Sequence, residues 1–203
     1  MTTRIVKKRI KISQFFGVIV LAYYVLGTSF WSMQKSLLGD ALFLLGTIMV
    51  GAGVLGRAWC LSYIAGNKRN MVIQHGPYSL CRNPLYLFSF MGAMGIGLAT
   101  KTFTFPLIIF IVFTIYYPLV FQKEEKELKL KFGSTFENYM KKTQSRIMPS
   151  FRNYQELERT EINLRSFRKG AFELIFFIIP LGLFPVVEAC HAIKLLPFFY
   201  PIY

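Results

Sequence analysis

Long apolar stretches, separated by clusters of basic residues, constrain this chain more than any other feature. A helix needs about 20 mostly apolar residues to cross a bilayer. The candidate spans are residues 12–30, 37–64, 85–99, 103–121 and 171–187, the last interrupted by Pro180 and Pro185. The pattern predicts an all-α, polytopic integral membrane protein with about five transmembrane helices, folded as a single domain over residues 1–203. The first span follows a basic N-terminus and resembles an uncleaved signal anchor.

The charge balance is strongly basic, with a net charge of +14, although charged residues make up only 17% of the chain. The basic residues flank the apolar stretches in clusters at 4–11, 57–82 and 123–169. A nucleic-acid-binding domain would instead place them on the face of a soluble fold. We therefore expect the basic clusters to bind the anionic headgroups of membrane lipids, and no nucleic acid. The three cysteines show neither metal-binding spacing nor a disulfide framework, so no metal site is predicted.

The basic residues also predict the orientation. If the N-terminus is cytoplasmic, only Lys35, Lys101 and Lys194 of the 24 Lys and Arg residues lie outside. Basic residues accumulate on the cytoplasmic side of membrane proteins. The polar segments 65–84 and 122–150 are therefore expected in the cytoplasm, with any active site that they form.

Two further patterns concern packing. Glycines recur in the second span (Gly46, Gly51, Gly53, Gly56) and in the third (Gly92, Gly95, Gly97), which favours close packing of these helices. Apolar residues at three- and four-residue steps follow the fourth span (Leu128, Phe132, Phe136, Tyr139). They predict that this span continues as an amphipathic helix over 122–140.

The segment 70–86 is the first candidate for chemistry. Gly76-Pro77 and Asn83-Pro84 are turn and helix-start signals, with Asn83 as the N-cap and Pro84 in the first helical position. A helix start at the membrane surface offers free N–H groups to an anion, and Arg82 adds a cation. The alternative for Arg82 is an interfacial arginine that pairs with lipid phosphate.

The second candidate is the pair Glu124-Glu125. Adjacent carboxylates near an anionic membrane surface need a compensating cation. Lys123 and Lys126 could supply it on a solvated face, or one carboxylate could bind a cationic ligand group. Together the two segments predict an anion site beside a cation site. S-adenosylmethionine carries an α-carboxylate, an α-amino group and a sulfonium, and it needs no metal.

Several motifs together resemble the isoprenylcysteine carboxyl methyltransferase family, which belongs with the phospholipid methyltransferases. The resemblance covers about residues 55–149 and implies a multi-span methyltransferase that uses S-adenosylmethionine and takes its lipophilic substrate from the bilayer. The motifs are Gly76-Pro77-Tyr78, Arg82-Asn83-Pro84-Leu85-Tyr86, Glu124-Glu125, Phe132-Gly133, Tyr139 and Arg146-Ile147-Met148-Pro149.

Carried over by position, the resemblance predicts the cofactor-binding residues. Two departures concern the site: eukaryotic members have His where Asn83 stands, and an arginine shortly before the acidic pair, where this chain has the apolar residues 118–121. Arg146 is the nearest basic candidate for the acceptor, with pairing to lipid phosphate as its alternative. The predicted cofactor-binding residues are Asn70, Met71, Val72, Ile73, Gly76, Tyr78, Arg82, Asn83, Pro84, Leu85, Tyr86, Glu124 and Glu125.

The expected reaction is methyl transfer to a lipophilic small molecule or lipidated substrate, with O-methylation of a carboxylate favoured. A carboxylate needs no general base, and His75 is the only histidine near the segment. A phospholipid N-methyltransferase is the alternative within the same chemistry. A nicotinamide-dependent membrane reductase and a non-catalytic scaffold or small transporter are the alternatives outside it.

Overall fold

A computed structural model of the chain describes residues 22–67, 70–197 and 199–203. The first predicted span, 12–30, lies mostly outside the described residues, as do the basic residues of the N-terminus. Residues 22–26 are helical. The elements that follow are β1 (Gly27–Ser29), α2 (Phe30–Met33), α3 (Leu37–Ile64), α4 (Pro77–Leu80), α5 (Pro84–Ala99), α6 (Thr104–Phe132), α7 (Ser134–Lys142), the 3-10 helix η1 (Phe151–Asn153), α8 (Leu164–Phe172), α9 (Ile175–Ala192) and β2 (Tyr200–Ile202).

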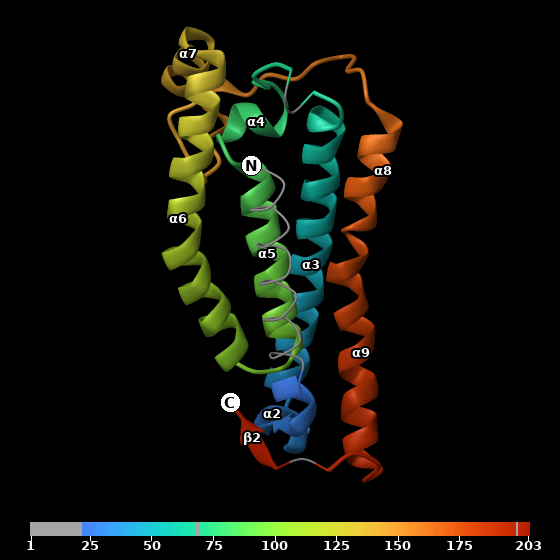
Figure 1. The fold of residues 1–203 in the computed structure, drawn as a ribbon. Helices are drawn as coiled ribbons and strands as arrows, with labels where there is room; N and C mark the ends of the chain where they lie inside the picture. The colour runs from blue at the N-terminus through green and yellow to red at the C-terminus, as the bar shows by residue number, and fades with distance from the viewer. Residues whose placement is uncertain (1–21, 68–69, 198) are drawn as a thin grey trace.

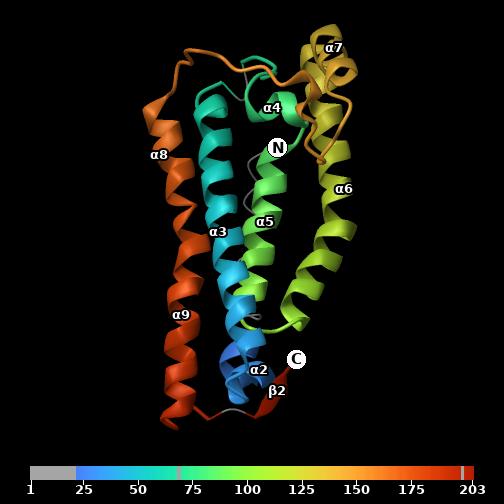
Figure 2. The same cartoon turned by 180° about the vertical axis from the view of Figure 1, so that it is seen from behind.

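The long helices stand side by side in the order α6, α5, α3 and α8–α9 (Figure 1), and the view from behind repeats this order in reverse (Figure 2). Three apolar helical stretches are long enough to cross a membrane: Leu37–Ile64, Thr104–Phe132 and Leu164–Ala192. Pro84–Ala99 is a shorter apolar helix. Large apolar side chains on their outer faces, such as Ile115 and Phe176, are 68% and 65% exposed. The protein is a multi-pass α-helical membrane protein, as the sequence predicts.

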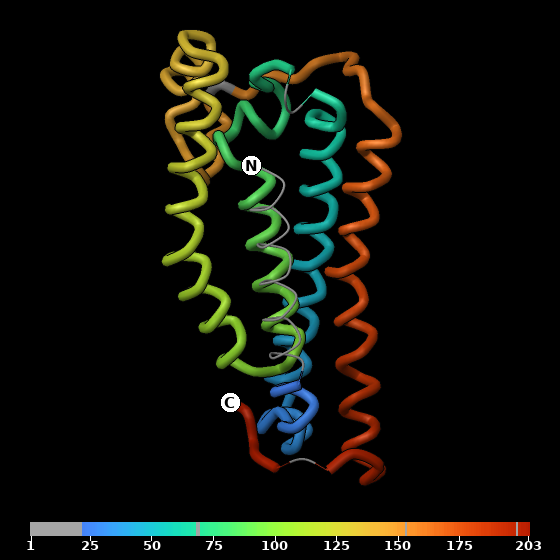
Figure 3. Tube along the Cα trace, viewed as in Figure 1, coloured from blue at the N-terminus to red at the C-terminus, as the bar shows by residue number. Residues whose placement is uncertain are grey.

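The two ends of the bundle differ in composition. At one end α3 ends, α5 begins and α6 ends. There α4 lies between α6 and α3, and α7 lies at the tip of α6 (Figure 1); we call this the α4 end. The opposite end holds α2, β2 and the last turn of α9, and we call it the α2 end (Figure 3). Residues 143–163 return from α7 across the α4 end to α8.

Glycines set the closest helix contact, between α3 and α5. A Cβ atom on Gly46 would lie 2.5 Å from the Gly95 carbonyl oxygen, and one on Gly53 would lie 2.7 Å from the Gly92 Cα atom. Side chains at these positions would push the two backbones apart. The packing function predicted for these glycines is therefore confirmed between α3 and α5 at Gly46, Gly53, Gly56 and Gly95. A Cβ on Gly92 or Gly97 would instead meet Phe177 or Pro106, and one on Gly51 would meet nothing within 4 Å.

Helix α6 continues beyond its apolar part, as predicted, but the amphipathic helix over 122–140 is interrupted. Gly133 adopts a positive φ of 49° and ends α6, and α7 begins at Ser134 in a new direction. The predicted apolar stripe is thereby divided between two helices. Its second half, Phe136 and Tyr139, is buried.

The last helices bind to the bundle through an ion pair near each end. Near the α4 end Glu173 lies 3.4 Å from Arg57, whose guanidinium also donates to Ser89 and lies over the Phe177 ring. At the α2 end Glu188 lies 3.0 Å from Lys101. Helix α9 runs through Pro180 and Pro185 without a break, which corrects the predicted interruption at these residues.

The fold is mostly helical, as predicted, and it also contains two short strands that pair at the α2 end. β1 and β2 are parallel, with Gly27 opposite Tyr200 and Ser29 opposite Ile202. Ser29 Oγ donates to the Lys101 carbonyl oxygen over 2.6 Å. The pair thus joins the end of the chain to the segment before α2 and to the α5–α6 turn. Three-residue strands that pair across more than 170 positions carry no periodic sequence signal.

Candidate active site

Two segments that lie far apart in the sequence pair through their backbones at the α4 end. The Arg82 and Asn83 amides donate to the carbonyl oxygens of Ser145 and Arg146, both over 3.0 Å. Further along, the Ser150 amide donates to the Leu80 carbonyl over 3.0 Å, and the Gly76 amide to Gln155 over 2.7 Å. The motif around Arg146 is therefore held directly beside the loop that leads into α5.

The Gly76-Pro77 pair begins α4 for a steric reason. Gly76 has a φ of 59°, a conformation that side chains with a Cβ rarely adopt. It also lies against the Tyr63 ring, which a Cβ at this position would overlap. Pro77 then takes the first helical position, where its missing N–H costs nothing. The turn places Tyr78 on the side of the loop that faces α7.

At the start of α5, the predicted positions are right but the predicted cap is not. Asn83 occupies the N-cap position and Pro84 the first helical position. The Asn83 side chain, however, makes no capping hydrogen bond. Its Nδ2 donates instead to the Arg146 carbonyl oxygen over 3.2 Å. Asn83 thus fixes the Arg146 backbone through both its main chain and its side chain.

The two adjacent glutamates have different surroundings. Glu125 lies 2.9 Å from Arg82 Nε and 3.4 Å from Arg146 Nη2, and its side chain is 13% exposed. Arg82 also donates to the carbonyl oxygens of Thr143 and Gln144 over 3.0 and 2.8 Å. Arg82 is therefore the internal partner of Glu125. This excludes both a solvated-face role for Glu125 and a lipid-phosphate role for Arg82 in this structure.

Glu124, in contrast, turns toward α5 and accepts a hydrogen bond of 2.6 Å from the Tyr86 hydroxyl group. Within the part of the chain that the structure describes, no basic side chain forms a salt bridge with it. The Tyr86 ring packs edge-on against Tyr117 and Phe121, each with 5.3 Å between ring centroids. Among the described residues, Glu124 therefore has an aromatic wall beside it and no cationic partner.

Two tyrosine hydroxyl groups and one cysteine thiol group in this region have raised pKa values. Burial raises the pKa of Tyr78, and negative charge nearby, including that of Glu124, raises it further. Burial likewise raises the pKa of the Cys81 thiol to about 11. Tyr139, whose pKa burial also raises, donates its hydroxyl proton to the Tyr78 carbonyl oxygen over 2.8 Å. None of these groups supplies a base at neutral pH.

An open groove of about 560 Å³ lies beside Glu125, between the end of α6, α7 and the segment that follows. Arg146 reaches into it with a half-exposed side chain (52%). Glu124 does not belong to its lining. The lining residues are Arg82, Glu125, Lys129, Glu137, Met140, Lys141, Gln144 and Arg146.

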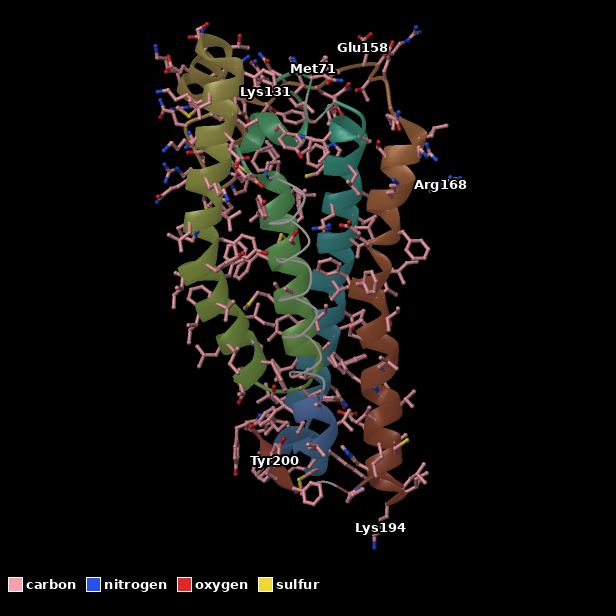
Figure 4. All side chains as sticks on the ribbon, in the orientation of Figure 1. Met71, Lys131, Glu158, Arg168, Lys194 and Tyr200 are labelled. Atoms are coloured by element: carbon pink, nitrogen blue, oxygen red, sulfur yellow. The ribbon has the colours of Figure 1, made fainter. Side chains whose placement is uncertain are left out.

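The structure brings together some of the predicted site residues and separates others. Tyr78, Arg82, Asn83, Tyr86, Glu124, Glu125 and Arg146 form one cluster, and Gly76, Pro84 and Leu85 shape the turns that carry it. Asn70, Met71, Val72 and Ile73 lie apart, in the loop before α4. Met71 is 55% exposed at the surface of the α4 end (Figure 4). Among the described residues, these four make no side-chain hydrogen bond or ion pair with the cluster.

Sequence reasoning missed the residues that connect the cluster. The Thr143 and Gln144 carbonyl groups and Gln155 take part through their backbones, which no side-chain pattern reveals. Tyr139 belongs to the apolar stripe and to the motifs of the family resemblance, but neither pattern predicts that its hydroxyl group holds the Tyr78 carbonyl. Within the described residues, no group of three or more His, Cys, Asp or Glu side chains is arranged to hold a metal ion.

Comparison with known proteins gives matches over most of the chain. The family model described as phospholipid methyltransferase matches residues 34–135. The cobalt-zinc-cadmium resistance protein CzcN of Cupriavidus metallidurans is 31% identical over 183 residues, which cover 90% of this chain and 82% of that protein. The nickel-cobalt-cadmium resistance protein NccN of Alcaligenes xylosoxydans xylosoxydans is 30% identical over 197 residues, which cover 95% of this chain and 89% of that protein. No solved structure matches the chain significantly.

Proposed function

We propose that this chain, which belongs to the phospholipid methyltransferase family, transfers a methyl group from S-adenosylmethionine to a lipophilic acceptor in the membrane. The family membership and the multi-pass helical fold support this reaction. The family membership weighs against a nicotinamide-dependent reductase and against a scaffold or transporter. S-adenosylmethionine, when bound, supplies an electrophilic methyl group on a sulfonium, which a nucleophile displaces in line.

The contrast between Glu124 and Glu125 is the observation that supports the proposal most directly. Glu125 is neutralised by two arginines, whereas Glu124 is held only by the Tyr86 hydroxyl group among the described residues. A positioned carboxylate that lacks a cationic partner fits the α-amino group of the cofactor. We assign Glu124 to that group, and Tyr78, Asn83 and the first turn of α5 to the surrounding walls.

The loop 70–73 would complete the cofactor site from the other side. Val72 and Ile73 are partly buried and apolar, which suits the adenosine part of the cofactor. Asn70 and Met71 are exposed and lie at the rim. This assignment rests on the family resemblance, because the loop makes no side-chain hydrogen bond or ion pair with Glu124 in the described structure.

The acceptor is expected to carry an apolar chain and an anionic group. Aromatic rings line the seam between α5 and α6 below Glu124, with 4.2 Å between the Phe90 and Phe113 centroids and 4.0 Å between Phe113 and Tyr117. Such a surface suits a lipid tail. Arg146 is the half-exposed cation in the groove beside Glu125, and its 3.4 Å contact with Glu125 is long for a charged hydrogen bond. We propose that Arg146 binds the anionic group of the acceptor.

O-methylation of a carboxylate on a lipophilic acceptor is the reaction that we favour. It needs no base, and the tyrosine and cysteine side chains around Glu124 stay protonated. N-methylation of a phospholipid amine is the second candidate, and the family match itself favours it. An assay of methyl incorporation into phosphatidylethanolamine distinguishes the two, because only the N-methyltransferase should label this lipid.

The names of the two relatives extend the proposal. Both are named for resistance to cobalt and cadmium. We propose that this chain contributes to the same kind of resistance through the methylated product. We also place the α4 end in the cytoplasm. The described basic residues gather there, as Arg168 and Lys131 illustrate, while Lys194 lies at the α2 end (Figure 4).

Calorimetric titration of the detergent-purified protein with S-adenosylhomocysteine tests the proposal. We expect binding of S-adenosylhomocysteine and no binding of NADPH. Glu124→Gln should abolish most of the affinity. Glu127→Gln, at an exposed position on the same helix with no salt bridge among the described residues, is the matched control and should not change it. Binding of NADPH, or equal affinity in both variants, would contradict the proposal.

A further inference from the structure

Helix α8 carries a basic, apolar-walled hollow on its outer face that the proposed reaction does not use. The hollow measures about 490 Å³ and is lined by Leu164, Arg165, Phe167, Arg168 and Ala171. Its walls come from the first two turns of α8. The same helix packs against α3 through Gly170, where a Cβ would lie 2.6 Å from Leu61 Cδ2.

The position of α8 places the hollow at the membrane boundary. The Asn163 amide donates to the Ala65 carbonyl over 3.1 Å, so α8 begins at the level where α3 ends. The Asn163 side chain caps α8 by accepting from the Ser166 amide over 2.9 Å. From there the helix leads into α9, which is apolar. Leu164 to Ala171 covers about 10 Å along the helix axis, enough to reach from headgroup level to the upper acyl chains.

The positive charge on this face has no acidic partner among the described residues. Arg165, Arg168 and Lys169 are exposed, and α8 itself contains no acidic residue. No salt bridge connects them to any acidic side chain of the described residues, whereas Arg57, Arg82 and Lys101 each have an acidic partner. Two arginines three positions apart lie on neighbouring turns of one helix face. Their planar guanidinium groups suit a phosphate, which each can bind through two hydrogen bonds.

We propose that this face of α8 binds an anionic phospholipid from the leaflet at the α4 end. Arg165 and Arg168 hold its phosphate, and Lys169 adds to the positive potential. Leu164, Phe167 and Ala171 receive the glycerol region and the first part of an acyl chain. Below them Phe172, which is 67% exposed, continues the apolar surface toward α9. The site lies on α8, apart from Glu124 and Arg146, and it does not depend on the proposed methyl transfer.

Native mass spectrometry of the full chain in detergent, titrated with phosphatidylglycerol or phosphatidylcholine, tests this site. We expect tighter binding of phosphatidylglycerol. The double variant R165Q/R168Q should weaken that binding roughly thirty-fold, because each basic residue near a membrane surface contributes about 1 kcal/mol. The control R152Q/R159Q removes two exposed charges from the preceding segment and should change it less than about two-fold.

Two outcomes would overturn the proposal. One is an equal loss in both double variants, which would show diffuse attraction to the whole basic surface. The other is displacement of phosphatidylglycerol by inorganic phosphate at the same concentration, which would exclude a contribution from the apolar walls. If R165Q/R168Q does not fold, R165K/R168K keeps both charges but loses the paired donors. It should still bind phosphatidylglycerol several-fold more weakly than the unmodified chain.

Discussion

Identical neighbouring residues can serve different purposes, and Glu124 and Glu125 are an example. Successive positions on a helix point about 100° apart, so Glu124 faces Tyr86 while Glu125 faces Arg82 and Arg146. The sequence shows two adjacent carboxylates but not the rotation of α6 about its axis. That rotation is decided by contacts with residues about 40 positions earlier and 20 later. The difference between the two carboxylates was therefore not predictable from the motif.

The two glutamates should separate binding from stability. Glu124→Gln should weaken S-adenosylhomocysteine binding by about 1.5–3 kcal/mol, because it removes a charge-assisted hydrogen bond to the ligand. The thermal unfolding of this variant should change little. Glu125→Gln should leave Arg82 without its carboxylate inside the protein and lower the free energy of unfolding by about 3 kcal/mol. Calorimetry and thermal unfolding in the same detergent measure both. If Glu125→Gln strongly lowers the affinity for S-adenosylhomocysteine without lowering stability, Glu125 would be the cofactor-binding residue in place of Glu124.

Arg146 should act on the acceptor side of the site. Arg146→Ala should lower turnover on the true acceptor, while S-adenosylhomocysteine affinity stays nearly unchanged, because Arg82 continues to neutralise Glu125. Arg152→Ala, at an exposed position in η1, is the control. Steady-state rates with titrated acceptor and titration with S-adenosylhomocysteine separate the two effects. Loss of cofactor affinity in Arg146→Ala would move this residue to the cofactor side.

The acceptor itself is expected to differ from a prenylated cysteine. The apolar residues 118–121 stand where the eukaryotic relatives have an arginine before the acidic pair. We therefore expect N-acetyl-farnesylcysteine to be methylated more slowly than the true acceptor. The incorporation of labelled methyl groups into each compound measures the two rates. Efficient methylation of this analogue would show that Arg146, or another cation, replaces the missing arginine fully.

At the scale of the elements, the sequence predicts the bounds of the helices, which depend on the length of each apolar stretch. It predicts poorly where a helix changes direction and where a side chain at its end points. α3 occupies the residues 37–64 of the second predicted span, and α5 begins one residue before the third. The break at Gly133 was missed, since the apolar stripe continues across it and only the positive φ marks the turn. The Asn83 side chain was assigned to its own helix, but its partner is a carbonyl 63 residues away.

The α3–α5 contact offers a matched test of packing. Gly53→Ala should lower the free energy of unfolding by about 1–3 kcal/mol, because the new methyl group meets the Gly92 backbone. Gly51→Ala, two positions away in the same helix, meets nothing within 4 Å and should stabilise α3 by up to about 1 kcal/mol. Thermal unfolding of both variants measures the difference. Equal effects would mean that α3 and α5 are less closely packed than described.

At the scale of the whole molecule, the basic residues and the fold agree on one polar end. The described lysines at positions 35, 101 and 194 lie at the α2 end, and each adopts or neighbours a turn. The sequence alone predicts this separation, because charge asymmetry is a property of composition along the chain. It does not predict how the ends are closed, since the β1–β2 pair and the ion pairs of Glu173 and Glu188 join positions far apart.

The proposed orientation is directly testable. A reporter fused after Met148 should be cytoplasmic, and one inserted near Lys101 should be exported, because the excess of basic residues keeps the α4 end inside. Alkaline phosphatase and green fluorescent protein fusions give opposite signals on the two sides. The reverse pattern at either position would place Glu124 and Arg146 on the wrong side for a cytoplasmic cofactor.

The backbone pairing between residues 76–83 and 145–155 has a consequence for how such proteins diversify. Main-chain hydrogen bonds do not depend on which side chain each residue carries. The positions around Arg146 can therefore exchange side chains over generations while the frame beside Glu124 stays in register. A change of acceptor then requires substitutions in one short segment and leaves the cofactor walls untouched. Randomising positions 146–148 and selecting for methylation of a new lipid is accordingly a practical route to altered specificity.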